Sequence, residues 1–112
     1  MKVYIGLAFS ASMLTGKGNL DFQPINFDDI KTIVNTSKYE SCVNPSHKAS
    51  LDALKIRYGI EIPIPEKAPK IMLESGDTMI VLQINGLPRE TREFTAEEVA
   101  KATFSAIMLS IN

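Results

Sequence analysis

The chain has 112 residues, of which 45% are hydrophobic and 22% are charged, and its net charge is −1. This length predicts one compact domain spanning residues 1–112. A chain with no overall positive charge has no field that attracts a long nucleic acid, so we exclude that partner. An anionic ligand would have to be small and held in a local pocket.

The apolar runs and the cysteine content bear on whether the chain is a membrane, secreted, disulfide-bonded or zinc-binding protein. The longest apolar run, near residues 79–82, is far too short to cross a membrane, and the N-terminus lacks the features of a signal peptide. We therefore expect a cytoplasmic protein with no membrane partner. The single cysteine, Cys42, excludes an internal disulfide, and one cysteine with one histidine disfavours zinc. We expect a buried Cys42 thiol, no metal and no cofactor; a Cys42–His47 nucleophilic pair would lack a third, orienting group.

The first half of the chain alternates strand and helix signals. Residues 2–9 are apolar on both faces, which predicts a central strand, and residues 19–23 alternate as a short second strand. Asn26 can cap a helix over residues 28–34, and residues 39–43 are expected to be extended.

A central helix is predicted next. Asn44 or Ser46 can cap it, Pro45 suits its first turn, and Gly59 provides its stop. Its apolar positions have helical spacing and predict one packed face. These positions are Leu51, Leu54 and Tyr58.

The second half is dominated by strand signals. Residues 60–65 alternate and contain prolines, as in an edge strand or a strand that ends. Residues 70–73 and 78–84 flank a turn at 74–77 and predict a hairpin, whose second strand ends at Asn85-Gly86.

The C-terminal segment combines a helix and a strand. Thr95 and Glu98 form a capping box for a helix over 96–102, and residues 103–111 predict a last strand. Together the elements predict an α+β domain, with a mixed sheet of about five to six strands and two to three helices.

The only histidine, His47, is predicted at the start of the central helix, among unpaired backbone N–H groups. Such a position suits a phosphate. The helix dipole disfavours an imidazolium there, yet a bound anion that raises its basicity would let His47 donate a proton to a leaving oxygen. The alternative is a capping or packing histidine without chemistry.

Several short motifs, taken in order, cover nearly the whole chain and resemble one viral family. They are Phe9 to Thr15 after the first strand, the His47-Lys48-x-Ser50 helix ending in Gly59-Ile60-x-Ile62, the Gly76-Asp77 hairpin, and Thr95-x-Glu97-Glu98 before the last strand. The chain is similar to the archaeal-virus and phage counter-defence proteins that include the anti-CRISPR type III ring nuclease. Phage proteins that sequester the cyclic ADP-ribose signal of Thoeris defence are of similar build.

The resemblance implies a homodimer, or a higher homo-oligomer, that holds cyclic tetra-adenylate across a subunit interface in the cytoplasm of an infected cell. In the nuclease members, a histidine protonates the 5′-oxygen leaving group as a ribose 2′-hydroxyl attacks, without a metal. On this chain His47 matches that histidine, Ser50 the Ser/Thr one turn later, and Ser10 the serine at the end of the first strand.

The chain also departs from the family pattern. Ser46 replaces a glycine before the histidine, and Lys67 stands near a family arginine whose forked contact a lysine cannot make. In the segment after Asn85, an ungapped match places Leu87 on a second arginine and Glu90 on the family glutamate.

The nearby arginines are Arg89 and Arg92, so either this loop is rebuilt or a charge-stabilising donor is lost. The segment 87–94 is then either a solvated, self-neutralising loop or a phosphate clamp, with Phe94 or Phe9 stacking on a base.

Three functions follow as hypotheses. The preferred one is an anti-defence sponge that sequesters a cyclic nucleotide signal; the second is a metal-independent ring nuclease; the third is a small module that binds a host protein through a strand edge. Candidate catalytic residues are His47 and Glu90. Candidate ligand-binding residues are Phe9, Ser10, Ser46, Ser50, Lys67, Asn85, Arg89 and Arg92.

Overall fold

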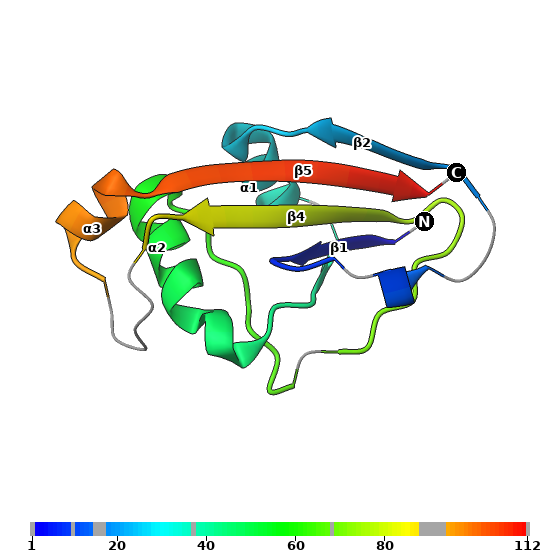
Figure 1. Cartoon of the computed structure of the whole chain (residues 1–112), viewed down its shortest axis with the longest axis horizontal. Helices are drawn as coiled ribbons and strands as arrows, with labels where there is room; N and C mark the ends of the chain where they lie inside the picture. Colours follow the sequence, from blue (N-terminus) through cyan, green and yellow to red (C-terminus); the bar gives the residue numbers. More distant parts are fainter. Residues whose placement is uncertain are drawn as a thin grey trace.

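The computed structural model describes residues 2–9, 11–14, 18–36, 38–67, 69–87 and 94–111. Their strands form one five-stranded mixed sheet in the order β2-β5-β4-β1-β3 (Figure 1). β1 runs parallel to β3 and β4, whereas β5 runs antiparallel to β4 and β2. The strands are β1 Val3–Gly6, β2 Leu20–Pro24, β3 Glu40–Ser41, β4 Thr78–Asn85 and β5 Thr103–Ile111.

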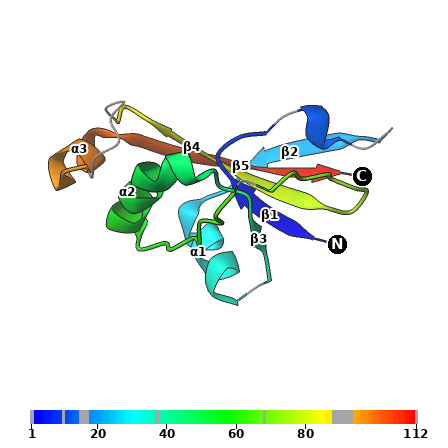
Figure 2. The same ribbon diagram turned by 90° about the horizontal axis from the view of Figure 1, so that it is seen from below.

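In these ranges three α-helices and two short 3₁₀ helices accompany the sheet, which confirms the predicted α+β class. Figure 2 shows α1 and α2 on one side of the sheet and the first 3₁₀ helix, η1, on the other. The helices are α1 Phe27–Thr36, α2 Lys48–Tyr58 and α3 Ala96–Lys101, with η1 at Ala11–Met13 and η2 at Pro45–His47.

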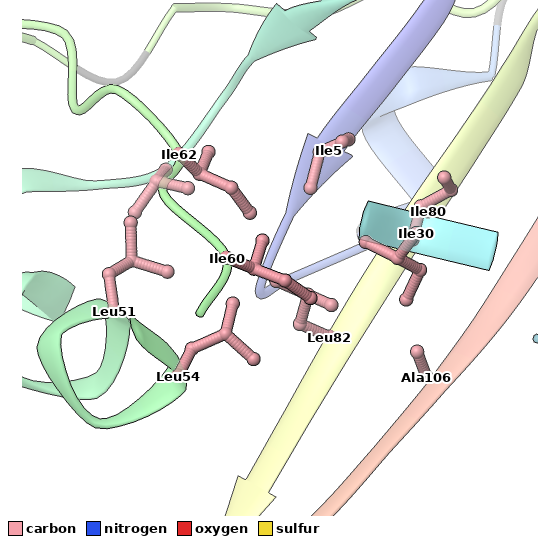
Figure 3. Close-up of a cluster of buried hydrophobic side chains, with 10 residues drawn as sticks. Ile5, Ile30, Leu51, Leu54, Ile60, Ile62, Ile80, Leu82 and Ala106 are labelled. Carbon is pink, nitrogen blue, oxygen red and sulfur yellow. The ribbon is translucent and has the colours of Figure 1, made fainter. Parts of the chain in front are cut away.

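The main core lies between the sheet and the two long helices (Figure 3). Alternate side chains of β1, β4 and β5 point to this face, because side chains in a strand alternate between the two faces of a sheet. Aliphatic side chains of α1, α2 and the segment after α2 close the core from the other side. The buried residues drawn there include Ile5, Ile30, Leu51, Leu54, Ile60, Ile62, Ile80, Leu82 and Ala106.

A second cluster covers part of the opposite face. Tyr4 and Met79 of the sheet pack there against Ile71 and Leu73. Cys42 is only half-buried against this cluster, and its thiol donates to the carbonyl oxygen of Ile5 at 3.3 Å. The expectation of a buried thiol is therefore met only in part.

The predicted hairpin is wrong. Residues 70–73 form no strand beside 78–84; Leu73 makes one isolated parallel bridge with Leu14. The reason is that β4 already has β1 on one side and β5 on the other. The turn itself is present, because Asp77 is buried and its carboxylate accepts hydrogen bonds from the backbone N–H groups of Glu74 at 2.9 Å and Lys2 at 3.1 Å.

Residues 60–65 form no strand, which corrects the edge-strand expectation. Ile60 and Ile62 are buried in the main core, and Pro63 and Pro65 lack the N–H groups that a ladder needs. The first strand is also shorter than expected, because β1 ends at Gly6 rather than at residue 9.

Three of the predicted helix ends are confirmed, whereas neither Asn44 nor Ser46 caps α2, whose N-cap is His47. The Asn26 side chain accepts from the N–H of Asp29 at 2.8 Å, and Gly59 ends α2 with a φ of 70°. Thr95 and Glu98 form the expected capping box at the start of α3. None of the helices in the described ranges is both long and apolar enough to cross a bilayer.

Candidate functional site

A half-open pocket of about 420 Å³ lies where the start of α2 meets the sheet. Its volume falls within the range of pockets that hold small ligands. The helix supplies two polar side chains, and β4 and β5 supply the floor. The lining residues are Leu7, His47, Ser50, Val81, Leu82, Gln83, Ile84, Ser105, Ala106 and Ile107.

His47 occupies the N-cap position of α2 but does not act as its cap. Its side chain makes no capping hydrogen bond, and Asn44 caps the preceding η2 turn by accepting from the N–H of Ser46 at 3.0 Å. The imidazole Nδ1 is buried and has no hydrogen-bond partner in the described part of the protein. The capping interpretation of His47 is therefore wrong, and the residue lines the pocket instead.

Ser50 lies in the first turn of α2 and lines the same pocket as His47. The N–H groups of His47 and Lys48 already donate to the carbonyl oxygens of Asn44 and Pro45, so it is the positive end of the helix dipole that favours an anion here. The structure thus brings together two of the predicted site residues at a helix end suited to phosphate.

The sheet contributes a polar pair that sequence reasoning missed. Gln83 of β4 lies directly opposite Ser105 of β5, and both side chains are exposed at the pocket floor. Val81 and Ile107 form the next pair on the same face. The signal was present in the sequence as a glutamine that interrupts the apolar run of β4, but the pairing partner was not known.

Other predicted residues lie away from this pocket. Phe9 packs against the second hydrophobic cluster rather than in the pocket, so its proposed stacking on a base finds no support. Phe94 is buried against Ala53 of α2 in a third cluster. Ser46 and Lys67 are exposed and do not line the pocket.

Asn85 ends β4, one residue beyond the pocket floor, and pairs with Thr103 of β5. Ser10, Arg89, Glu90 and Arg92 lie outside the described residues. No cluster of three or more metal-ligating side chains occurs within the described ranges.

The fold and the pocket define a small α+β protein with a mixed sheet and a ligand-sized hollow at the start of α2. The chain matches the model of the STIV B116-like family over residues 5–106 and belongs to this viral protein family.

Its fold is similar to that of B116 of Sulfolobus turreted icosahedral virus, with a TM-score of 0.74 and 14% sequence identity over 98% of this chain and 99% of that chain. No curated protein sequence matches the chain.

Proposed function

We propose that this viral protein binds a small cyclic nucleotide signal of host defence in the His47–Ser50 pocket and withholds it from the host effector. The observation that carries this proposal is the shared pocket itself. The start of α2 and a polar part of the sheet line one hollow of about 420 Å³. The protein would act in the cytoplasm of the infected cell.

The sequence predicts that further phosphate contacts come from the segment after β4. Ile84 lines the pocket and Asn85 follows it directly, so this segment starts at the pocket edge. Arg89 and Arg92 remain the predicted donors to phosphate oxygens. An arginine suits this role because its guanidinium group binds phosphate through two parallel hydrogen bonds.

A ring nuclease is the second candidate, and the unpartnered imidazole favours it. His47 lines the pocket, and its Nδ1 has no hydrogen-bond partner in the described residues. In this role His47 would donate a proton to a 5′-oxygen as a 2′-hydroxyl attacks the phosphorus. Such general acid catalysis contributes roughly 10²–10⁴ to a rate.

We also propose that the active form is a homodimer joined along β2. This strand lies at the edge of the sheet, all five of its residues are exposed, and Phe22 is 70% exposed. Ile25 donates its N–H to Ala106 on β5, so the main-chain groups of Leu20 and Phe22 point outward. An edge of this kind is a template for pairing with another strand.

The β2 sequence complements itself when two copies pair antiparallel about Phe22. Leu20 then lies opposite Pro24 of the second copy, which can still accept through its carbonyl oxygen although it lacks an N–H. Asp21 lies opposite Gln23 of the second copy, which avoids two carboxylates facing each other. The two Phe22 rings meet on the face that carries the pocket floor, since Phe22, Leu109 and Met79 form one row.

The deciding experiment incubates purified protein with cyclic tetra-adenylate or cyclic ADP-ribose, follows its thermal unfolding, and analyses the nucleotide released by heat. A raised Tm with intact nucleotide recovered supports sequestration. Linear products ending in a cyclic phosphate that vanish with His47→Ala support the nuclease. No shift with any nucleotide contradicts both and leaves a host-protein-binding module at the β2 edge.

A further inference from the structure

The strand β4 continues past its parallel neighbour β1. Pairing between them ends at Gly6 and Val81, whereas β4 extends to Asn85. Figure 1 shows the end of β4 running on beyond β1 toward α2. Within the described part of the chain, the end of β4 therefore has β5 on one side and no strand on the other.

The hydrogen-bond phase of β4 fixes which main-chain groups face the open side. Thr78 donates its N–H to the carbonyl oxygen of Lys2 at 2.9 Å, so the main-chain N–H and C=O groups of even-numbered β4 residues point toward β1. The N–H of Ile111 on β5 donates to the carbonyl oxygen of Asp77 at 3.0 Å, so the main-chain groups of odd-numbered residues point toward β5. Leu82 and Ile84 thus direct their main-chain groups to the side where β1 has ended.

Both residues line the same pocket as His47 and Ser50. The Leu82 side chain is buried in the main core, and its carbonyl group is directed to the side where β1 has ended. Within the described residues, neither the carbonyl oxygen of Leu82 nor the N–H of Ile84 has a backbone partner. The pocket therefore contains an acceptor and a donor two residues apart on one strand edge.

We propose that this open edge of β4 reads an adenine base, with the Leu82 carbonyl accepting from the 6-amino group and the Ile84 N–H donating to N1. The inference rests on the proposed nucleotide function and deepens it. A carbonyl at one position and an N–H two positions on match the donor and acceptor of the adenine Watson–Crick edge. The phosphates would then lie toward the start of α2, next to His47 and Ser50.

The same arrangement rejects other bases. Guanine presents an oxygen at position 6 and a proton at N1, which places acceptor against acceptor and donor against donor, and unpaired polar groups in a pocket are costly. A ligand whose adenine N1 carries a covalent bond, as in N1-linked cyclic ADP-ribose, also lacks the required acceptor. The edge therefore selects a ring with a free adenine edge.

Atom-swapped ligands test the proposal on the unaltered protein. Cyclic tetra-adenylate made from 1-deazaadenosine lacks the N1 acceptor, and the 7-deazaadenosine ring lacks N7 but keeps the Watson–Crick edge. By calorimetry we expect the 1-deaza ring to bind at least about tenfold more weakly than the parent ring, as one lost hydrogen bond implies, and the 7-deaza ring to match the parent.

Equal binding of all three rings overturns the base-reading proposal while leaving the proposed function intact, and so does a loss confined to the 7-deaza ring. Binding of none of them, with cyclic ADP-ribose also unbound, overturns the proposed function itself. The two failures are thus distinguishable.

A protein variant tests the same contact from the other side. Ile84→Pro removes the N–H that points to the pocket and leaves every hydrogen bond between β4 and β5 in place. A strand tolerates proline where the N–H of the replaced residue pairs with no other strand. Ile84→Val keeps the N–H and serves as the matched control. We expect Ile84→Pro to bind the parent ring about tenfold more weakly and to lose its preference over the 1-deaza ring. If Ile84→Pro still prefers the parent ring over the 1-deaza ring, the proposal is contradicted. If this variant does not fold, the series of ligands on the unaltered protein still decides.

Discussion

A Cβ atom added to Gly6 at the end of β1 would lie 2.7 Å from Sγ of Cys42. Only glycine therefore fits at position 6 while the Cys42 side chain keeps its position, because real Cβ atoms do not approach other heavy atoms so closely. Cys42 donates its N–H to Ile5 at 2.9 Å, which holds the two segments at this separation.

We predict that Gly6→Ala lowers the free energy of unfolding by about 1–3 kcal/mol, because the added methyl group overpacks this contact. Cys42→Ala removes the sulfur, so the double variant should recover part of the loss. Denaturant titration of the two single variants and the double variant gives the coupling. Additive losses would show that the contact with Sγ is not the cause.

The second prediction concerns the Cys42 thiol. Burial is the largest influence on it and raises its pKa from 9.0 to about 11, so little thiolate forms near neutral pH. Alkylation of the native protein at pH 8 should be much slower than alkylation in denaturant. Equal rates in the two states would contradict the raised pKa.

The same shift has a consequence for stability. As pH rises from about 9 toward 11, the unfolded chain loses the thiol proton before the folded chain does, so unfolding becomes more favourable across this window. Cys42→Ala should therefore lose less stability than the parent protein between these pH values in denaturant titrations. Parallel losses in both proteins would assign the pH dependence to other groups.

The third prediction concerns the start of α3. The Thr95 hydroxyl accepts from the N–H of Glu98 at 3.2 Å, and the Glu98 carboxylate accepts from the N–H of Thr95 at 2.9 Å. Thr95→Ala should destabilise the protein by about 1 kcal/mol, whereas Thr95→Ser, which keeps the hydroxyl, should have a much smaller effect. Similar Tm losses in the two variants would argue against the capping role.

The fourth prediction tests the β2 interface. Phe22→Lys places a charge where two copies are proposed to meet, so sedimentation should show a dimer for the parent protein and a monomer for this variant. Ile56→Lys is the matched control, because Ile56 is 55% exposed on α2, away from the β2 edge. A parent protein that remains monomeric at high concentration, or a dimeric Phe22→Lys variant, would refute the interface.

Much of the local structure was predictable because helix ends depend on neighbours in the chain. Asn26, Gly59 and the Thr95–Glu98 pair mark helix ends by interactions that span three or four residues. The position of His47 at the start of the central helix followed from the same local signals. The structure adds the η2 turn, which precedes this helix and which the sequence did not predict.

The strand partners were less predictable. The turn at residues 74–77 was correctly placed, yet residues 70–73 do not pair with β4, because β1 and β5 flank it. Which strand pairs with which depends on the packing of segments distant in the chain, and a turn signal does not contain that information.

The sequence by itself determined the class of the fold, three of the helix ends and the placement of His47 and Ser50 around the start of the central helix. Only the tertiary structure decided that Gln83 and Ser105 line one pocket with these two residues, and that β4 extends past β1 at the same pocket. The reason is physical: caps and turns arise from contacts a few residues apart, whereas a pocket exists only where strand register and helix packing bring distant segments together.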